Sequence, residues 1–580
     1  MQISSRKNIL IVIPLVLLVI LSTTSAFAAS TPAVGGNFVV ALVSEPTTLN
    51  PYTGAWNNGF VDAQILEPLL TYANNLSIVP DLATSYSVNY QQGSYTFNLR
   101  PNVKWSDGQP FTAEDVKFSF EQIISKYDIF GAFYFANTTV TITNNNQTVI
   151  IKPGRFLPGI QLLLFASLDT AIVPEHVLAG QNFLQSSFLQ DPIGTGPFVL
   201  SQWVKGSYIQ LNRNPNYWGA PEPYLDNITI RFITDPTALE AAVSSGQVDY
   251  VFRGIPYSAY PTLNQTGTVK VIPSTRPPYE TAIWFNLNSP YISNPDVRKA
   301  IDYALNKTDI AYKATSGVAQ AVDYTIDPTA VPPSPGIVKY PYNVSMANYL
   351  LDQAGYPVQP NGSRFTLQLL TRTGAPDEAI AAQLIKSDLA QVGINVNIQT
   401  VDFATYLSLQ SKGQYQMSVI SYWLSPIWTY QLFDSAWIGK GPFTNNFFYN
   451  SSVTDALFNQ WLQATQPSQQ VQILQQIENQ LSQDLPEIPL YADVWINLVN
   501  TNFVGSSIPV GKYVFWDSLA NVYSLSAQSQ QVSSSPSGNN LLYAGVAVII
   551  VLLVAVVAIM LVRRRRSSGT SGSKDKSSPT

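Results

Sequence analysis

The order of apolar and polar residues predicts alternating helices and strands over most of the chain. Strict alternation, which is typical of a half-buried strand, occurs in three short segments, at residues 95–99, 228–232 and 394–398. Apolar residues recur at the spacing of one helix face in three longer segments, at residues 235–246, 294–305 and 377–392. The third helix runs directly into the third strand. This pattern predicts an α/β architecture with several lobes.

The start of the chain has the layout of a secretory signal peptide. Two basic residues precede an apolar run at residues 9–21, and the small residues of a signal-peptidase site follow at Ala26 and Ala28. The apolar run is short for a stable membrane span. We therefore predict a signal peptide at residues 1–28, with an uncleaved N-terminal anchor as the alternative.

The end of the chain predicts a membrane anchor. Residues 541–562 carry no charge and are long enough to cross about 30 Å of hydrocarbon as a helix. Four consecutive arginines begin the tail at residues 563–580, which the positive-inside rule places in the cytoplasm. The preceding residues 524–540 lack the apolar side chains that offset chain-ordering entropy, and they predict a flexible stalk. We therefore expect a single-pass protein of the cell membrane, with an extracellular body and a cytoplasmic C-terminus.

Composition excludes several kinds of chemistry. The 580 residues include no cysteine and a single histidine, His176. Disulfides, thiol catalysis and thiolate metal sites are therefore excluded, and a Ser-His-Asp hydrolase or a multi-histidine metal site is disfavoured. The formal net charge is −5, and residues 29–540 are more acidic still because basic residues gather at the two ends. A body this acidic repels phosphate backbones, so nucleic acid is not expected as a partner.

Glycosylation sequons of the type Asn-x-Ser/Thr occur in the body and are absent from the predicted anchor and tail. They are consistent with a glycosylated outer surface. Export without disulfides, combined with a stalked and tethered body, favours an archaeal source. The sequons lie at Asn75, Asn137, Asn146, Asn227, Asn264, Asn306, Asn343, Asn361 and Asn450.

A collinear series of short motifs resembles the family 5 extracellular solute-binding proteins, the dipeptide- and oligopeptide-binding components of ABC importers. The series covers about residues 37–523, and its most specific block lies between residues 80 and 116. The motifs are Glu45–Pro51, Pro80–Ala83, Tyr95–Arg100, Val103–Gly108, Pro110–Val116, Ile172–Val177, Gly194–Phe198, Arg213–Trp218, Ser245–Asp249, Phe285-Asn286, Val297–Ile301, Leu350–Tyr356, Gly393-Ile394 and Pro486–Leu490.

The resemblance implies a type II periplasmic-binding-protein-like α/β fold with three lobes, a hinge and a ligand cleft between lobes. Hinge segments are expected near residues 272–274 and 488–491. Ligand-driven closure of such a hinge is a shift in conformational population that a membrane translocator can recognise. The solute-binding domain would span residues 29–523, with lobe I at about 29–70, 190–280 and 490–523, lobe II at about 71–189, and lobe III at about 281–489.

The resemblance also implies a non-enzymatic role: capture of extracellular peptides for ABC permease and ATPase subunits on separate chains, with no cofactor, metal or catalytic residue. Peptide-binding relatives are understood to pair a lobe III aspartate with the peptide amino group. The matching segment here, residues 417–430, contains no acidic residue, and the first one after it is Asp434. It is rich in aromatic residues instead, which stack on sugar faces or receive apolar side chains. The predicted ligand-binding residues are Trp423, Trp428, Tyr491, Tyr279 and Trp56, with Trp284 near another expected cleft edge.

Other functions remain open at this point. An oligosaccharide ligand is the alternative within the same role, because the lobe III acid is missing. A surface-anchored glycoside hydrolase would need two carboxylates about 5–10 Å apart, and the sequence shows no recognisable pair. A surface-layer or adhesion protein would more often contain repeats, and none is found.

Several motif residues predict structural rather than binding roles. Thr112–Asp115 has the pattern of a helix capping box. Gly194–Gly196 lacks the length and the lysine of a phosphate-binding loop, so a tight turn is expected. We expect His176 to pack at the start of a helix and Arg298 to lie on a solvated helix face, where it could pair with a carboxylate.

Overall fold

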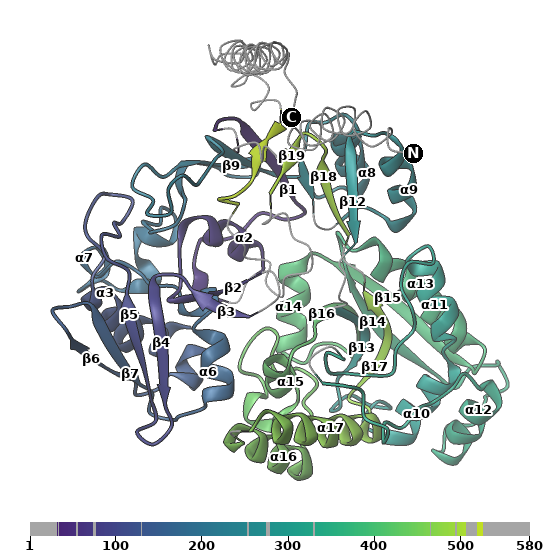
Figure 1. Cartoon of the computed structure of the whole chain (residues 1–580). Coiled ribbons are helices and arrows are strands. Elements are labelled where there is room, and N and C mark those ends of the chain that lie inside the picture. The colour runs from purple at the N-terminus through teal and green to yellow at the C-terminus, as the bar shows by residue number, and fades with distance from the viewer. Residues whose placement is uncertain are drawn as a thin grey trace, which may run out of the picture. The chain divides into compact units, whose positions relative to one another are not determined.

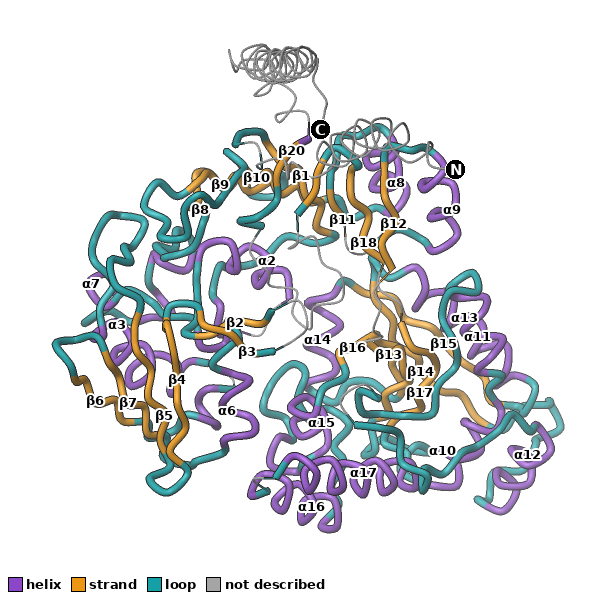
Figure 2. The backbone as a smooth tube through the Cα atoms, in the orientation of Figure 1, coloured by secondary structure: helices purple, strands orange, loops and turns teal. Residues whose placement is uncertain are grey.

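A computed structural model describes residues 32, 34–53, 56–73, 77–128, 130–251, 254–273, 279–328, 331–464, 466–493, 496–505 and 519–525. Residues Val34–Ser524 form one compact unit. Within it the structure contains three main sheets, each covered by helices (Figures 1 and 2). The predicted signal peptide, the predicted transmembrane segment and the tail lie outside the described residues.

The first main sheet has seven strands and combines the start of the body with its end. Strand β1 pairs in parallel with β10, and β18 lies between β11 and β12. Helices α8 (Pro236–Ser244) and α9 (Tyr260–Gln265) supply apolar residues to its core. The strand order is β12 (Val269–Pro273), β18 (Ile496–Asn500), β11 (Tyr250–Val251), β1 (Asn37–Leu42), β10 (Asn227–Phe232), β9 (Tyr208–Arg213) and β8 (Phe198–Val204).

The second main sheet is antiparallel and has four strands. Helices α3 (Ala113–Phe118) and α6 (Pro158–Leu164) belong to the same part of the chain, as does the single-turn helix α5 (Gly131–Tyr134), which precedes β6. The strand order is β4 (Ala83–Asn89), β5 (Ser94–Leu99), β7 (Thr148–Lys152) and β6 (Thr139–Thr143). Two short hairpin-like pairs complete the strand pairing: β2 (Leu70–Tyr72) with β3 (Ile78–Pro80), and β19 (Phe503–Val504) with β20 (Tyr523–Ser524).

The third main sheet has five strands and is surrounded by the larger helices. Its strand order is β15 (Ile394–Val401), β14 (Phe365–Arg372), β16 (Met417–Trp423), β13 (Tyr279–Phe285) and β17 (Glu487–Asp493). The helices in this part of the chain are α10 (Pro295–Ala304), α11 (Lys307–Ala314), α12 (Val344–Gln353), α13 (Pro376–Ala390), α14 (Phe403–Ser411), α15 (Pro426–Phe433), α16 (Ser452–Gln463) and α17 (Pro467–Asp484). All of β13 is buried, as expected for a strand covered on both faces.

The chain passes twice between the seven-stranded and the five-stranded sheet. One passage connects β12 to β13 and the other connects β17 to β18. Because β12 pairs with β18 and β13 pairs with β17, the strand ends on either side of the two connections lie next to each other. Residues 488–491, which we predicted as one hinge segment, lie within β17, and the passage follows Asp493. The lobe boundaries and the hinge itself stay predictions.

The elements with strong periodicity are confirmed. The three predicted strands appear as β5, β10 and β15, and the three predicted helices as α8, α10 and α13. Their ends follow ordinary capping chemistry. Asn294 accepts a hydrogen bond from the Asp296 backbone N–H, with Pro295 in the first helical position. Gly246 has a φ of 71°, the left-handed conformation that ends a helix.

The Thr112–Asp115 and Gly194–Gly196 motifs have structural roles. Thr112 and Asp115 form the predicted capping box at the start of α3. Gly194 is needed for a different reason than the tight turn that we predicted. A Cβ at this position would lie 1.8 Å from the carbonyl oxygen of Ile65, so only glycine permits the close approach to the end of α2 (Trp56–Ile65). The neighbouring Gly196 donates its N–H to the same carbonyl at 2.8 Å.

Of two further predictions, the one for Arg298 is corrected by contacts that are distant in sequence, and the one for His176 is confirmed. Arg298 is only 6% exposed, so the predicted solvated position is wrong. Its guanidinium donates to the main-chain carbonyls of Ile292 and of Asp484, the last residue of α17. Free carbonyls at a helix end need such donors, which explains why the charge can be buried. His176 packs near Trp105 at the start of a helix, as predicted, and its Nε2 lies 2.8 Å from Asp107 Oδ2.

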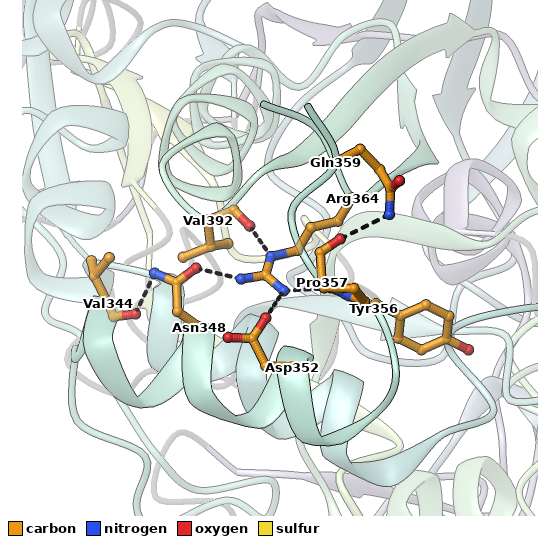
Figure 3. Close-up of polar contacts among 8 residues, drawn as sticks. All are labelled: Val344, Asn348, Asp352, Tyr356, Pro357, Gln359, Arg364 and Val392. Atoms are coloured by element: carbon orange, nitrogen blue, oxygen red, sulfur yellow. Dashed lines mark hydrogen bonds and ion pairs between the residues drawn. The ribbon is translucent and has the colours of Figure 1, made fainter. Parts of the chain in front are cut away.

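The motif at Leu350–Tyr356 surrounds a second buried arginine. The side chain of Arg364 is 2% exposed. It donates to Val392 O at 2.9 Å, to Asn348 Oδ1 at 2.9 Å, to Asp352 Oδ1 at 2.5 Å and to the carbonyl of Tyr356 (Figure 3). These contacts fasten the end of α12 to the start of β14 and to the end of α13. The motif therefore has a packing role here.

The expected membrane localisation is corrected. Among the residues that the structure describes, none of the helices combines the length and the apolar character needed to cross a bilayer. The predicted span at residues 541–562 lies outside those residues. The single-pass localisation with a cytoplasmic C-terminus is accordingly withdrawn.

Candidate functional site

The candidate site is built on the end of strand β16. This strand lies between β14 and β13 in the five-stranded sheet, and only its last residue, Trp423, is partly exposed. The chain then turns into α15, where Ser425 accepts a hydrogen bond from the Trp428 backbone N–H and Pro426 occupies the first turn. Every residue of α15 from Trp428 to Phe433 is buried. A helix buried on all sides needs partners on several faces.

Some of those partners come from the part of the chain that forms the four-stranded sheet. The rings of α5 and its flanking residue pack against α15 and the short 3-10 helix η8 (Ser435–Trp437) that follows it. The ring centroids of Phe130 and Trp428 lie 5.6 Å apart, and those of Phe133 and Trp437 lie 5.0 Å apart. Tyr134 and Tyr430 are 6.4 Å apart. We refer to this set of six rings as the α5–α15 contact.

The α5–α15 contact joins segments that are about three hundred residues apart in the chain. Its rings prefer the tilted and edge-to-face geometries that are observed here. The hydrophobic cluster that contains Trp428, Tyr430 and Trp437 is continuous with the core around the four-stranded sheet. Residues from two of the predicted lobes therefore meet at the site where the sequence predicted aromatic ligand contacts.

The acidic side chain that follows α15 in the chain has a structural task. Asp434 is 5% exposed, and its Oδ1 accepts the backbone N–H of Ala436 at 2.9 Å, which caps η8. Burial raises its pKa to about 6, against a smaller lowering by this hydrogen bond. The carboxylate is therefore already used within the protein. This arrangement is consistent with the sequence argument that the segment after β16 offers no carboxylate for the amino group of a peptide.

The predicted ligand-binding residues fall into two groups. Trp423 and Trp428 lie close together, with ring centroids 6.4 Å apart, and Tyr279 is the register partner of Trp423 across β13 and β16. Tyr491 lies on β17 instead, fully buried, with its hydroxyl 3.3 Å from Asp377 Oδ2. Trp56 begins α2, and its side chain is outside the described part of the structure.

Sequence reasoning misplaced one aromatic residue and missed a whole element. Trp284 was expected near a cleft edge, but it is fully buried against Tyr422 and Phe447, with centroids 5.2 and 4.6 Å away. The missed element is α5, whose single turn is too short to show helical periodicity. The density of aromatic residues in Phe130–Phe135 was the one available signal.

Comparison with known proteins supports the family resemblance found in the sequence. A family model described as "Bacterial extracellular solute-binding proteins, family 5 Middle" matches residues 77–443, which is more than half of the chain. The chain belongs to this family. The family consists of non-enzymatic solute-binding proteins of ABC transporters. The α5–α15 contact of this family 5 solute-binding protein lies within the matched region.

Individual relatives agree with the family assignment. A Brucella ovis protein named as an ABC transporter peptide-binding protein is 31% identical over 354 residues, which cover 60% of this chain and 65% of the relative. This solute-binding protein thus spans just under two thirds of that relative's length. The nickel-binding periplasmic protein of Escherichia coli is 27% identical, over 65% of this chain and 74% of the relative.

Solved structures show the fold. The oligopeptide-binding protein AppA of Bacillus subtilis, solved with a nonapeptide, superposes with a TM-score of 0.75 at 23% identity, covering 85% of this chain and 100% of that one. The predicted type II periplasmic-binding-protein fold is therefore confirmed. These relatives are bacterial, and neither the archaeal source nor the glycosylation predicted for this solute-binding protein has support among them.

Proposed function

We propose that this protein is the substrate-binding subunit of an ABC importer, and that it captures peptides and delivers them unchanged to permease and ATPase subunits on separate chains. The observation that supports this proposal best is the α5–α15 contact. It brings aromatic rings from two predicted lobes together around a segment without a free acid. Rings of this kind accept apolar side chains of varied sequence and lose few rotamers on binding.

The proposal includes the lobe arrangement and the ligand contacts predicted from the sequence. Lobes I and III would move about the two passages between the seven-stranded and five-stranded sheets. Trp423, Trp428 and Tyr279 would contact the cargo near these passages. An oligosaccharide is the second candidate cargo, because the carboxylate of Asp434 is occupied by the Ala436 N–H and tryptophan faces stack well on sugar rings.

A thermal-shift screen of the purified full-length chain tests the proposal. The set would contain di- to pentapeptides and maltotriose. Each would be added at concentrations up to about 1,000 times a micromolar dissociation constant, at which binding stabilises the folded state by about 4 kcal/mol. A peptide that raises the Tm supports the proposal, and a rise with maltotriose alone favours the second candidate. No rise with any member contradicts both.

A matched pair of variants locates the site. Trp423→Ala should remove the ligand-induced rise in Tm, because its partly exposed ring lies at the end of β16 beside Trp428. Trp203→Ala on β8 also removes a partly exposed tryptophan, and it should leave the rise unchanged. An equal loss of the rise in both variants would argue against a binding role for Trp423.

A further inference from the structure

Two polar side chains in the α5–α15 contact are buried without a hydrogen bond. Gln431 of α15 is 0% exposed, and neither its Oε1 nor its Nε2 has a partner among the residues that the structure describes. The hydroxyl of Tyr134, on α5, is also buried and makes no hydrogen bond within that part of the chain. Buried polar groups are nearly always paired, so each exception requires an explanation.

The two groups lie near each other across the contact. The Gln431 amide is close enough to lower the pKa of the Tyr134 hydroxyl, although burial has the larger effect and raises it well above its usual value. This lowering is the effect of a side-chain interaction between the two groups, but their atoms do not meet the distance and angle of a hydrogen bond. The unused atoms are therefore a hydroxyl on one predicted lobe and a carboxamide on another.

A second buried glutamine shows what a structural amide looks like in the same region. Gln161 of α6 is also 0% exposed, yet all of its hydrogen-bonding capacity is used. Its Oε1 accepts from the Tyr95 hydroxyl and the Leu157 backbone N–H, both at 2.8 Å. Its Nε2 donates to the carbonyls of Tyr134 and Arg155, at 2.6 and 2.8 Å. Packing alone therefore does not prevent a buried amide in this region from being satisfied.

We propose that the Gln431 carboxamide and the Tyr134 hydroxyl determine cargo specificity by receiving an uncharged hydrogen-bonding group of the bound solute. This inference rests on the proposed solute-binding function and adds the class of cargo group. A carboxamide presents a donor and an acceptor side by side. Its complement is a group that accepts and donates side by side, such as a backbone peptide amide or a pair of neighbouring sugar hydroxyls.

A charged cargo group does not fit this position. The titratable side chain nearest to Gln431 in sequence, Asp434, is committed to the Ala436 N–H. Against the larger effect of burial, which raises both values, Arg155 lowers the pKa of Tyr134 and of Asp434. Asp434 and Asp455 act in the opposite direction on the pKa of the neighbouring Tyr430, so the charges around the rings already offset one another. An ammonium or carboxylate placed between the rings would have to compete for these partners, which is more costly than burying a neutral amide. The contact therefore selects for a neutral part of the cargo, whatever charges the rest of the cargo carries.

Removal of the two polar groups tests the inference in the full-length chain without any ligand. Gln431→Leu deletes an amide that has no partner, so the unliganded Tm should stay within about 1 °C of the wild type or rise. Tyr134→Phe deletes one hydroxyl and should behave in the same way. Gln161→Leu, the matched control, should lower the Tm by about 5 °C because four partners lose their hydrogen bonds. A fall in Tm for Gln431→Leu comparable to that of Gln161→Leu would overturn the inference.

Calorimetric titration supplies the second readout, with free trialanine, N-acetyl-trialanine amide and maltotriose as probes. Gln431→Leu and Tyr134→Phe should each weaken the wild-type binder by about 10-fold or more, which corresponds to about 1.4 kcal/mol. The two peptides, which share backbone amides, should be affected alike, and loss with maltotriose alone would assign the group to a sugar. Dissociation constants within twofold of the wild type in both variants would overturn the inference. If the wild type binds none of the probes, the proposed function fails for these cargoes and the inference fails with it, whereas wild-type binding that both variants retain overturns the inference alone.

Discussion

Two buried glutamines in one region of the molecule have opposite surroundings. Gln161 makes four hydrogen bonds that connect α6 to β5, to the end of α5 and to the residues before α6, whereas Gln431 on α15 makes none within the described residues. Both are 0% exposed. The difference teaches that burial by itself does not identify a structural polar group. Fully paired groups hold the fold together, and unpaired groups mark positions where something else is expected to bind or titrate.

The largest loss of stability is expected when the hydrogen-bonded glutamine, Gln161, is replaced. Gln161→Leu should lower the free energy of unfolding by about 4 kcal/mol, because the Tyr95 hydroxyl, the Leu157 N–H and two carbonyls lose their partner inside the protein. Urea-induced unfolding monitored by tryptophan fluorescence measures it. A loss below about 1 kcal/mol would show that these hydrogen bonds are replaced by other contacts.

A pH-dependent effect on the order of 3 kcal/mol is expected from the buried carboxyl group of Glu487, of which only one oxygen has a hydrogen-bond partner among the described residues. Burial raises the pKa of Glu487 to about 8, although the Tyr422 hydroxyl donates to it at 2.7 Å. The folded state therefore holds a proton that the unfolded chain releases near pH 4.5. This contribution to stability is complete below about pH 4.5 and is lost as the pH rises to about 8.

Unfolding experiments at several pH values measure this loss, and Glu487→Gln is the control. The variant keeps the shape of the side chain but cannot titrate, so its stability should change less between pH 5 and 8. Neighbouring Glu280 and Glu478 also have raised pKa values from burial, so some slope should remain. An identical slope in the variant and the wild type would assign the pH dependence to other groups.

An effect of about 2 kcal/mol is expected from the buried arginine of Figure 3. Arg364→Met removes donors from the carbonyls of Val392 and Tyr356 and leaves them in a protein interior. Lys313→Met is the matched control, since it breaks an exposed ion pair with Asp309 and should cost about 0.5 kcal/mol or less. Equal losses in the two variants would mean that burial of the Arg364 network adds nothing.

Regular elements were predictable because their signals are local. The alternation of Ile394, Val396 and Ile398 and the caps around Asn294 are written in neighbouring residues, and the structure confirms both. Groups whose environment comes from distant segments were not predictable. Arg298 is buried because the end of α17, 186 residues away, supplies a carbonyl.

The candidate site shows the same division. The aromatic density after β16 pointed to Trp423 and Trp428, which do lie together. The partners on α5 were missed because a single turn carries no periodic signal, and Gln431 carried no local mark of its unpaired state. Pairing of buried polar groups is a property of the assembled fold. Sequence patterns therefore predict well which segments lie at a site. They predict less well which polar atoms at that site lack a partner within the protein and are available to a ligand.

Recovery of bound cargo by mass spectrometry tests the central claim most directly. The full-length chain would be incubated with a defined mixture of di- to pentapeptides and maltotriose, separated from free solute by gel filtration, denatured and analysed. The account predicts about one solute molecule per chain, released with unchanged mass. Recovery of shortened or hydrolysed products, or of no solute from any mixture, would contradict it.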